Sequence, residues 1–431
     1  MSQLIDNFEI SFEEFLRELP ENFHDLAREF KAFARSRKID STAMLLQVIM
    51  MYCGIDLALR ATAGNVTLLK EKISDTAIHN RLKACGSWIK ALLKEMLPVG
   101  EVLPDSLRIL VVDGSTVQGS GAKGTWNRIH LAINLVTLEI DYVEVTDRHG
   151  GESLKRYPFR KGDIVMGDRG YNQPQVIAEL DRDGVMIIVR LNPWSMPLYE
   201  RGDDVPNEKR VDLVERLSNT SSDYCSIQVA LRTPAGEYCE GYVHAYRLPP
   251  PQAEAARRRC RQSNKNTPSE ETLFYAGWVM VFTTVPVSVL AMEVILAVYR
   301  VRWQVELVIK RMKSILDLDL LRARRDSILG DVWLHGKLLY AMVIEKIARR
   351  KNGGTLDSLS QVRTKTPWRL LRMVKLSIDT SIASVSSWRN ENWSACIEVM
   401  KERPRRRQLQ TLPDPIKQLL AYRNSAIVGV V

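Results

Sequence analysis

The chain is organised around the stretch SVLAMEVILAVYRVRWQVELVIKRMKSIL, residues 288–316. It contains no proline or glycine, and its apolar residues recur at helical spacing, so it predicts one long amphipathic helix. At about 100° per residue, one stripe of this helix faces a core and consists of Val301, Val305, Val308 and Met312. A second stripe places a carboxylate among cations and a phenol, and consists of Tyr299, Arg302, Glu306 and Lys313. The pattern therefore predicts one buried face and one face available for chemistry.

Two carboxylates upstream suggest what that chemistry is. Asp113 ends the apolar run in LRILVVDGS, and Asp168 ends the run in DIVMGDRGY. Carboxylates at strand ends can converge with a glutamate on a helix face and bind divalent metal, because Mg²⁺ prefers oxygen ligands. Two-metal sites of this kind drive in-line attack on phosphodiesters. Two simpler interpretations stay open: Arg302 and Glu306 as a surface ion pair, and the aspartates as turn formers before glycine.

The spacing Y-x2-R-x3-E-x6-K in residues 299–313 resembles the signature of one group of DDE transposases. These are the bacterial insertion-sequence enzymes of the YREK type, the insertion-sequence-four family. The segments VVDGST and GDRGY resemble the blocks that hold the first and second aspartate of this group, and the resemblance extends over residues 70–350. It implies an RNase H-like catalytic core of the α/β (α+β) class. It also implies that Asp113, Asp168 and Glu306 are catalytic and hold two Mg²⁺ ions, or Mn²⁺ in their place.

The resemblance also implies contacts with DNA. Arg302 and Lys313 would lie beside Glu306 and contact phosphates, the arginine through its planar fork and the lysine as a point charge. Tyr299 can donate its hydroxyl to a phosphate. Arg169, next to Asp168, is a further candidate for a DNA contact, and its alternative is a surface ion pair.

Trp278 stands upstream of Tyr299, in a run that reads as a strand. A tryptophan in a strand commonly belongs to the core. Transposases of this group, however, have a tryptophan at the corresponding place that stacks on a base flipped from the terminal hairpin, so the resemblance implies DNA binding by Trp278. An indole face can restore part of the stacking that an extruded base loses. Further phosphate contacts are expected from three basic runs: Arg257–Arg261, Arg322–Arg325 and Arg403–Arg407.

The periodicity from Leu107 onward predicts the strands of the catalytic domain, residues 101–350. Three successive strands are expected in LRILVVDG, WNRIHLAINL and LEIDYVEVTD. GDIVMGD and VMIIVRL read as buried strands, with a crossover helix in PQVIAELDRDG. This order is the one expected of an RNase H-like core, with the two aspartates on adjacent strands.

A β-rich insertion is expected at residues 192–286, because the distance from Asp168 to Glu306 is too long for one strand, one helix and tight loops. We predict it to be all-β and interrupted by a basic coil. Its expected strands are VDLVERL, YCSIQVALRT, EYCEGYVHAYRL and TLFYAGWVMVFTTV, and the coil is PPPQAEAARRRCRQSNKNTPSEE.

The flanking regions read as helical. In residues 1–100, Ser41 or Asp40 caps a helix, Gly64-Asn65 predicts a turn, and Ser74 or Asp75 begins more helix. A DNA-binding domain and a support domain both fit this region, and the resemblance favours binding of the element ends. Residues 351–431 are predicted to form a helical region that supports dimer formation.

The composition limits the class of protein. The chain has 431 residues and a formal net charge of +10, which favours a polyanionic partner such as DNA. Its six cysteines form no C-x2-C pair, which argues against a zinc site and for reduced thiols. Residues 1–17 do not resemble a signal peptide, and the apolar run 43–59 contains polar residues and reads as a core helix. We therefore expect a protein without membrane contact, in the cytoplasm of a bacterium and associated with the nucleoid.

These features, taken with the resemblance, predict a DNA transposase that acts by cut-and-paste chemistry. The resemblance, and not the residue spacing, implies the sequence of nicking, hairpin formation, reopening and strand transfer. Its expected partners are the terminal inverted repeats of the element, target DNA and a second copy of the chain in the DNA complex. Two alternatives are a transposase-derived DNA-binding protein without catalysis and another RNase H-like nuclease. The intact set of three carboxylates argues against the first, and the long β-rich insertion argues against the second.

Overall fold

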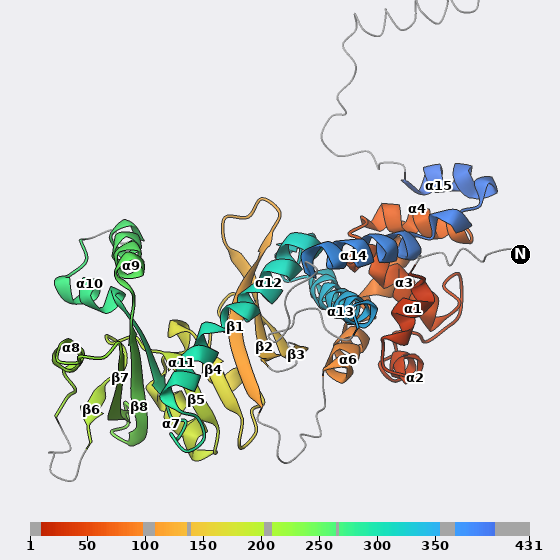
Figure 1. Cartoon of the computed structure of the whole chain (residues 1–431). Coiled ribbons are helices and arrows are strands. Elements are labelled where there is room, and N and C mark those ends of the chain that lie inside the picture. Colours follow the sequence, from red (N-terminus) through yellow and green to blue (C-terminus); the bar gives the residue numbers. More distant parts are fainter. Residues whose placement is uncertain are drawn as a thin grey trace, which may run out of the picture.

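The computed structural model describes residues 10–97, 108–135, 139–201, 209–263, 267–353 and 367–400. The molecule is elongated, with a helical body at one end and a mixed β-sheet extending away from it (Figure 1). The chain passes from the helical body into the sheet and returns through two consecutive helices, residues 292–300 and 303–316.

The first five strands form the part of the sheet that the sequence predicts. They run in the spatial order β3-β2-β1-β4-β5, with β1, β2 and β3 antiparallel and β1, β4 and β5 parallel. The crossover helix α7 connects β4 to β5 as predicted. The bounds are β1 (Ile109–Gly119), β2 (Thr125–Asn134), β3 (Glu139–Asp147), β4 (Ile164–Gly167), α7 (Pro174–Arg182) and β5 (Met186–Arg190). A short strand, β10 (Leu320–Leu321), adds to β1 in parallel.

The expected insertion continues the same sheet. Its last strand pairs antiparallel with β5, and the sheet then continues in the order β9-β8-β7-β6. The bounds are β6 (Leu198–Glu200), β7 (Tyr224–Arg232), β8 (Tyr238–Arg247) and β9 (Trp278–Thr283). The insertion is therefore not a separate sheet but an extension of the first one.

The prediction of an all-β insertion was wrong in three segments, which are helical. They are α8 (Leu213–Ser218), α9 (Pro250–Ser263) and α10 (Glu270–Ala276). Two of them begin at side-chain caps: Asp212 accepts a hydrogen bond from the Glu215 amide at 2.9 Å, and Ser269 accepts one from the Thr272 amide at 3.2 Å. These caps satisfy backbone N–H groups that a helix end leaves unpaired, and they outweigh the apolar pattern of VDLVERL and TLFYA.

The stretch 288–316 forms two helices rather than the single helix predicted. They are α11 (Met292–Arg300) and α12 (Trp303–Leu316). Between them the backbone tightens, because the amides of Val301 and Arg302 donate to carbonyls three residues earlier at 3.0 and 3.1 Å. The expected apolar stripe is nevertheless buried at Val305, Val308 and Met312.

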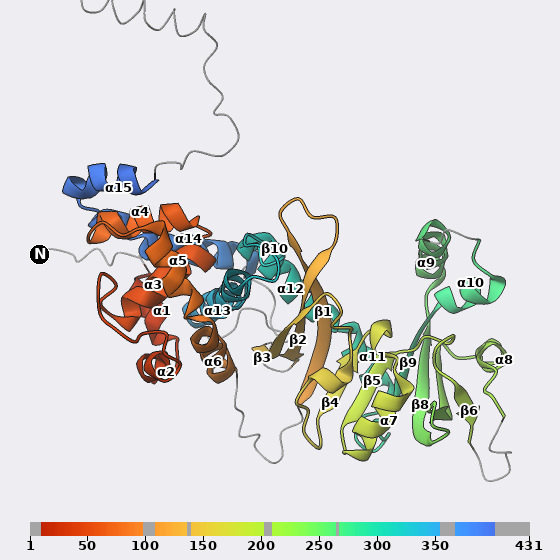
Figure 2. The ribbon, with the colours of Figure 1, turned by 180° about the vertical axis from the view of Figure 1, so that it is seen from behind.

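The two faces of the sheet carry different helices. Helices α11 and α12 cross one face, and α7 lies on the other (Figure 2). Side chains alternate between the faces along each strand. Ile109 and Val111 accordingly share a core with α12, whereas Val112 shares a core with α7.

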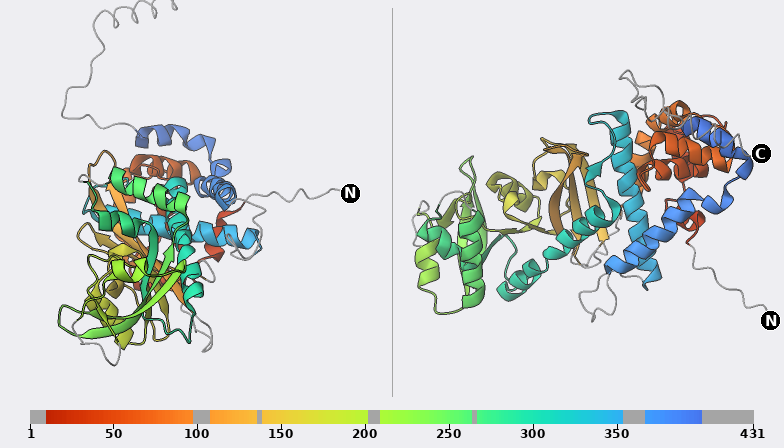
Figure 3. Two further views of the ribbon diagram at one scale, coloured as in Figure 1. Left: turned by 60° about the vertical axis from the view of Figure 1, so that its left-hand side comes forward. Right: turned by 90° about the horizontal axis from the view of Figure 1, so that it is seen from above.

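The helical body is built from both ends of the chain. Helix α13 contacts α3, α6 and α14, and α15 packs on α4, so the two predicted terminal regions form one body (Figure 3). Its helices are α1 (Phe12–Arg17), α2 (Phe23–Glu29), α3 (Thr42–Cys53), α4 (Leu59–Leu69), α5 (Asp75–Lys83), α6 (Gly86–Met96), α13 (Ile328–Lys351), α14 (Pro367–Ala383) and α15 (Trp393–Met400). None of the described helices is long and apolar enough to cross a membrane.

Two details of the helical body test the sequence predictions. Ser41 and Ser74 cap α3 and α5, as predicted, by accepting hydrogen bonds from the amides of Met44 and Ala77. The turn predicted at Gly64-Asn65 was wrong, because both residues lie inside α4. Gly64 is there because α15 lies close: a Cβ at this position would be 3.1 Å from the Met400 sulfur. The basic run at residues 403–407 lies outside the described residues.

Candidate active site

Asp113 and Asp168 lie at the same level of two adjacent parallel strands. Val111 of β1 pairs with Met166 of β4, and each aspartate follows two positions later. Because side chains alternate along a strand, the Asp113 carboxylate belongs to the face that α11 and α12 cover. Asp168 follows the end of β4, and its charge acts on Asp113. Asp113 lies inside β1, which stays paired with β2 beyond it, so the interpretation of Asp113-Gly114 as a turn was wrong.

Backbone amides orient both carboxylates. An Asp113 oxygen accepts a hydrogen bond from the Gly114 amide at 2.8 Å, and an Asp168 oxygen accepts one from the Gly170 amide at 2.8 Å. Asp168 also caps the short 3₁₀ helix Arg169–Tyr171, which starts where β4 ends. Because β4 ends at Gly167, β1 has no β4 partner beyond this point, on the side where Asp113 lies.

Arg302 lies at the break between α11 and α12 and balances the acidic group. Its guanidinium donates to the carboxylate of Glu306 one helical turn later, so the predicted i,i+4 ion pair is present. The Arg302 side chain is only 17% exposed, and that of Glu306 is 54% exposed. Burial lowers the pKa of Arg302, but the nearby groups of Tyr299, Glu306, Asp113 and Asp168 outweigh burial and raise this pKa. The arginine therefore joins the carboxylates of the sheet to the carboxylate of α12.

Burial and the negative charges of this group contribute to a raised pKa of Asp113. Burial raises this pKa to about 6, Arg302 lowers it, and the negative charges of Asp168 and Glu306 raise it. Tyr299, expected on an exposed stripe, is buried at the end of α11. Burial raises the pKa of its phenol, while Arg302, which lies beside it, lowers it. The structure thus brings five of the predicted residues into one group: Tyr299, Arg302, Glu306, Asp113 and Asp168.

Glu152 is a carboxylate at this site that the sequence analysis missed. It lies in the loop between β3 and β4, within the segment HGGES. A Cβ on Gly114 would be 2.9 Å from one oxygen of Glu152, and a Cβ on Gly170 would collide with the other. Burial raises the pKa of Glu152, and the charge of Asp168 raises it further. The sequence signals it only as an acidic residue in a glycine-rich loop. Its spacing from Asp113, Asp168 and Glu306 matches no catalytic motif.

Three other predicted residues lie outside this group: Lys313, Arg169 and Trp278. Lys313 is seven residues beyond Glu306 on α12, roughly 10 Å along the helix axis, and it lies near Ser115 and Thr116 of β1. Arg169 follows Asp168 directly, but it lines a different hollow, together with Arg190. The structure therefore separates these cations from the pair formed by Arg302 and Glu306.

Trp278 lies in the core rather than on a free surface. Its side chain is 5% exposed and belongs to the apolar cluster on the α7 face of the sheet, with Met280 and Phe282. The guanidinium of Arg247 covers its ring at 4.8 Å, and the ring of Phe274 lies 6.4 Å away. Stacking on a flipped base needs an accessible ring face, which this conformation does not offer. The core interpretation of Trp278 fits the structure.

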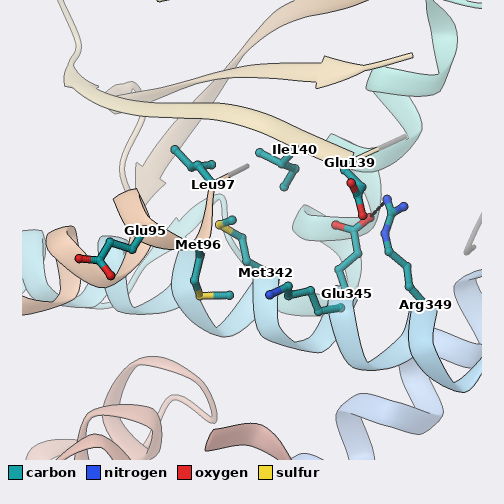
Figure 4. A pocket seen from close by; sticks show the side chains of 9 residues that line it. Glu95, Met96, Leu97, Glu139, Ile140, Met342, Glu345 and Arg349 are labelled. Carbon is teal, nitrogen blue, oxygen red and sulfur yellow. Dashed lines mark hydrogen bonds and ion pairs between the residues drawn. The ribbon is translucent and has the colours of Figure 1, made fainter. Parts of the chain in front are cut away.

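A separate hollow lies between α6, β3 and α13 (Figure 4). Its volume is about 370 Å³, and Arg349 lies there beside Glu345, with which it forms an ion pair at 3.1 Å, and beside Glu139. The hollow shares no residue with the acidic group, so it is a separate feature of the molecule.

The donors of the acidic group are hard oxygens, which suit Mg²⁺ or Mn²⁺. Within the described residues, no three side chains of His, Cys, Asp or Glu are close enough to enclose a metal ion. The ion pair with Arg302 holds the Glu306 carboxylate, and opening of this pair would release an oxygen ligand. The oxygen donors of these residues therefore fit a divalent ion. Binding by Glu306 requires that its ion pair with Arg302 opens first.

Comparison with known proteins agrees with this arrangement. Residues 104–333, more than half of the chain, match the family model described as "Transposase DDE domain". The chain is 28% identical over 340 residues to InsL of insertion sequence element IS186A from Escherichia coli (strain K12), covering 76% of this chain and 90% of InsL. It is equally similar to the transposase for insertion sequence element IS421 of Escherichia coli, over 341 residues, 76% of this chain and 91% of that protein.

More distant similarities are also present. The transposase for insertion sequence element IS231F of Bacillus thuringiensis subsp. israelensis is 26% identical over 201 residues, 42% of this chain and 40% of that protein. A solved piggyBac transposase synaptic complex with hairpin DNA aligns over 94% of this chain and 87% of its own at 9% identity, with a TM-score of 0.37 that supports no conclusion about fold. Because the family model matches residues 104–333, more than half of the chain, the chain belongs to the family of transposases that have a DDE domain.

Proposed function

We propose that the chain is a DNA transposase that moves an insertion sequence by cut-and-paste chemistry. The observation that carries this proposal is the placement of Asp113 and Asp168 at one level of adjacent parallel strands, with Arg302 and Glu306 against them. The named relatives, which are transposases of insertion sequences, support it.

The strand order supports an RNase H-like core as the catalytic scaffold. Three antiparallel strands followed by two parallel strands, in the order β3-β2-β1-β4-β5, match the arrangement expected of that core. The fold by itself does not define a function. The carboxylates at the open edge beside β4 are what favour phosphodiester chemistry.

In the proposed mechanism, Asp113, Asp168 and Glu306 hold two divalent ions. Such ions, when bound, activate the attacking water or 3′-hydroxyl and stabilise the leaving oxygen. Glu306 must first leave Arg302, which frees the guanidinium to bind a DNA phosphate in fork geometry. Tyr299 lies beside Arg302 and supports its orientation. Lys313, further along α12, is proposed to contact a phosphate away from the cleavage point.

The proposed DNA partners are the terminal inverted repeats of the element and the target. The net charge of +10 favours such partners. Hairpin formation on the element end and a dimer in the DNA complex are further parts of the proposal. A time course on end-labelled DNA tests the hairpin step, because a hairpin runs as one covalently closed product on a denaturing gel.

The proposal is tested with neutral variants of the three carboxylates. Asp113→Asn, Asp168→Asn and Glu306→Gln should each abolish cleavage of element-end DNA, because each removes a charge that holds the ions. Gel-shift affinity should stay near that of the native protein or rise, because loss of a negative charge reduces repulsion of phosphates. Asp183→Asn, an exposed carboxylate at the end of α7, serves as the control and should cut normally.

The same assay separates the alternatives. If the native protein binds element ends but none of the metals tested supports cutting, a DNA-binding protein without catalysis is the better description. If it cuts structured DNA without any preference for element ends, another nuclease is the better description. Undiminished cutting by any of the three variants would remove that residue from the site.

The metal requirement gives an independent check. Mg²⁺ and Mn²⁺ should support cleavage and Ca²⁺ should not, because Ca²⁺ takes longer and looser oxygen coordination that misplaces the reacting oxygens. Cleavage that persists in EDTA would contradict the two-metal mechanism.

A further inference from the structure

A basic cleft lies next to the proposed catalytic group. Its volume is about 1240 Å³, and its walls come from the end of β5, the loop that follows it, and helices α9 and α10. Arg169, Arg190 and Arg259 line it, and none of the described residues that line it is acidic. The cleft therefore offers at least three positive charges to a ligand.

The backbone at the first two arginines is tied together by one side chain. The side-chain amide of Asn172 donates to the carbonyl of Arg169 at 2.9 Å and to the carbonyl of Arg190 at 2.7 Å. Neither guanidinium forms an ion pair with any residue that the structure describes, although the charge of Asp168 acts on Arg169. Desolvation lowers the pKa of Arg169, and the neighbouring charge of Arg190 lowers it further. Two guanidinium groups close together, neither of them in an ion pair, are typical of an anion site.

The cleft lies next to the acidic group, although no residue of that group lines it. Arg169 follows Asp168 in the chain, and the charge of Arg190 lowers the pKa of Tyr299, which lies beside Arg302. A strand that lies along these arginines would consequently reach the carboxylates.

An exposed indole completes the wall. Trp194 is 62% exposed, in the turn after β5, where its amide donates to the Asn192 side chain at 3.3 Å. Its ring meets that of Tyr275 at 6.1 Å and 76°, an edge contact rather than a stack. Exposure of so large an apolar ring is unfavourable in water, and its position among arginines is typical of a surface that binds nucleic acid.

We propose that this cleft binds single-stranded DNA, with phosphates on Arg169, Arg190 and Arg259 and an unpaired base on Trp194. A duplex offers its phosphates to such a surface but keeps its base faces stacked inside, so Trp194 favours a single strand. The proposal rests on the proposed function for the origin of this strand, which is the DNA opened next to Asp113 and Asp168. Binding itself needs neither metal nor cleavage.

Fluorescence anisotropy of a labelled oligothymidylate, titrated with the full-length protein in EDTA, tests this proposal. Trp194→Ala should weaken binding about tenfold or more, because one base stacked on an aromatic ring is worth about 1–3 kcal/mol. Trp194→Phe should recover part of the affinity, because the smaller ring still offers a face. Affinity for a labelled duplex of mixed sequence should fall less than twofold in both variants.

Matched controls come from the same chain. Trp393→Ala removes another exposed indole (51%) from α15 in the helical body and should leave the affinity unchanged. Arg259→Ala should weaken binding and reduce its salt dependence, whereas Arg258→Ala, its neighbour on α9 outside the cleft, should have a smaller effect. A thermal melt of each variant confirms that the fold is intact.

Three results would overturn the proposal: equal affinity of native protein and Trp194→Ala, equal loss with Trp393→Ala, or tighter binding of an oligouridylate than of the oligothymidylate. These results are separable from failure of the proposed function. A chain that cuts element ends but shows no Trp194 dependence keeps its function and loses this cleft. A chain that binds the strand through Trp194 but never cuts keeps the cleft and loses the function.

Discussion

Arg302 is a single positive charge beside three carboxylates, those of Asp113, Asp168 and Glu306. Its ion pair neutralises Glu306, and the two aspartates of the sheet remain close enough to raise the pKa of Asp113. Like charges held together in a partly desolvated place are unfavourable unless cations neutralise them. Proton uptake by Asp113 near pH 6 is one route to neutrality, and a divalent ion is the other.

Glu152, which is not one of the three DDE carboxylates, is predicted to affect metal binding. Glu152→Gln should raise the Mn²⁺ concentration needed for half-maximal binding by roughly 10- to 100-fold, the usual effect of removing a charged partner beside metal ligands. The carboxylate lies against Gly114 and Gly170, whose amides orient Asp113 and Asp168, so its loss changes the charge around both. Mn²⁺ binding, followed by electron paramagnetic resonance without DNA, is the measurement.

Glu144→Gln is the control for this experiment. Glu144 is also half-buried and paired with an arginine, since its carboxylate lies 3.3 Å from Arg156, while Glu152 lies 3.9 Å from Arg128. Equal effects of the two variants would show that Glu152 acts only on the general charge of this region.

Among the elements, the break between α11 and α12 has the largest consequence for the site. In one straight helix, Tyr299 and Val305 would point about 120° apart, yet both are buried here. The tightened turn at Val301 and Arg302 changes the phase between the two helices and makes this possible. It also puts Arg302 at the N-terminal end of α12, where its side chain reaches Glu306 and the carboxylates of the sheet.

A close helix crossing gives a prediction at the same scale. A Cβ on Gly336 of α13 would be 2.6 Å from the sulfur and 2.9 Å from the Cβ of Cys53 at the end of α3. Gly336→Ala should therefore force the two helices apart and lower stability by about 1–3 kcal/mol, the usual cost of overpacking. Gly124→Ala, in open space before β2, should change stability little. Urea unfolding curves measure both, and equal midpoints for the two variants would contradict a tight crossing.

The whole molecule joins one sheet to one helical body, and α13 packs against α3, α5, α6 and α14 within that body. The ammonium of Lys337 on α13 is buried and donates to the Asp56 carboxylate and the Gly54 carbonyl, at 2.6 and 2.8 Å. Asp56 also accepts a hydrogen bond from the Trp333 indole at 3.0 Å. A buried charge that is paired and hydrogen-bonded in this way defines one arrangement of the body, because other arrangements would leave the charge unpaired.

The pH dependence of folding is a property of this whole structure. His130 and His244 are fully buried in the sheet, and burial lowers the pKa of each to about 4, with Arg156 and Arg128 adding to the effect at His130. The unfolded chain binds protons near pH 6.5, so it takes up more protons than the folded chain between pH 6.5 and 4. Stability should fall as the pH decreases through this window, by up to about 3 kcal/mol for each histidine.

Melting temperatures across this range measure the effect. His244→Phe should flatten the acid side of the curve, because neither ring nitrogen of His244 has a hydrogen-bond partner among the described residues and phenylalanine cannot take up a proton. His149→Gln, an exposed control, should leave the slope unchanged. A slope that is the same in His244→Phe and in the native protein would exclude His244 as a source.

The amino-acid sequence by itself determined the first five strands of the sheet, the crossover helix, and the caps at Ser41 and Ser74. These features depend on local periodicity and on residues close in the chain, so they can be predicted from a single sequence. The tertiary structure alone decided the burial of Trp278, the position of Gly64 inside α4 and the break after α11. It also placed Glu152 beside the aspartates and opened the cleft at Trp194. Each of these depends on contacts between distant parts of the chain, because packing and burial decide between conformations that local patterns leave nearly equal in energy.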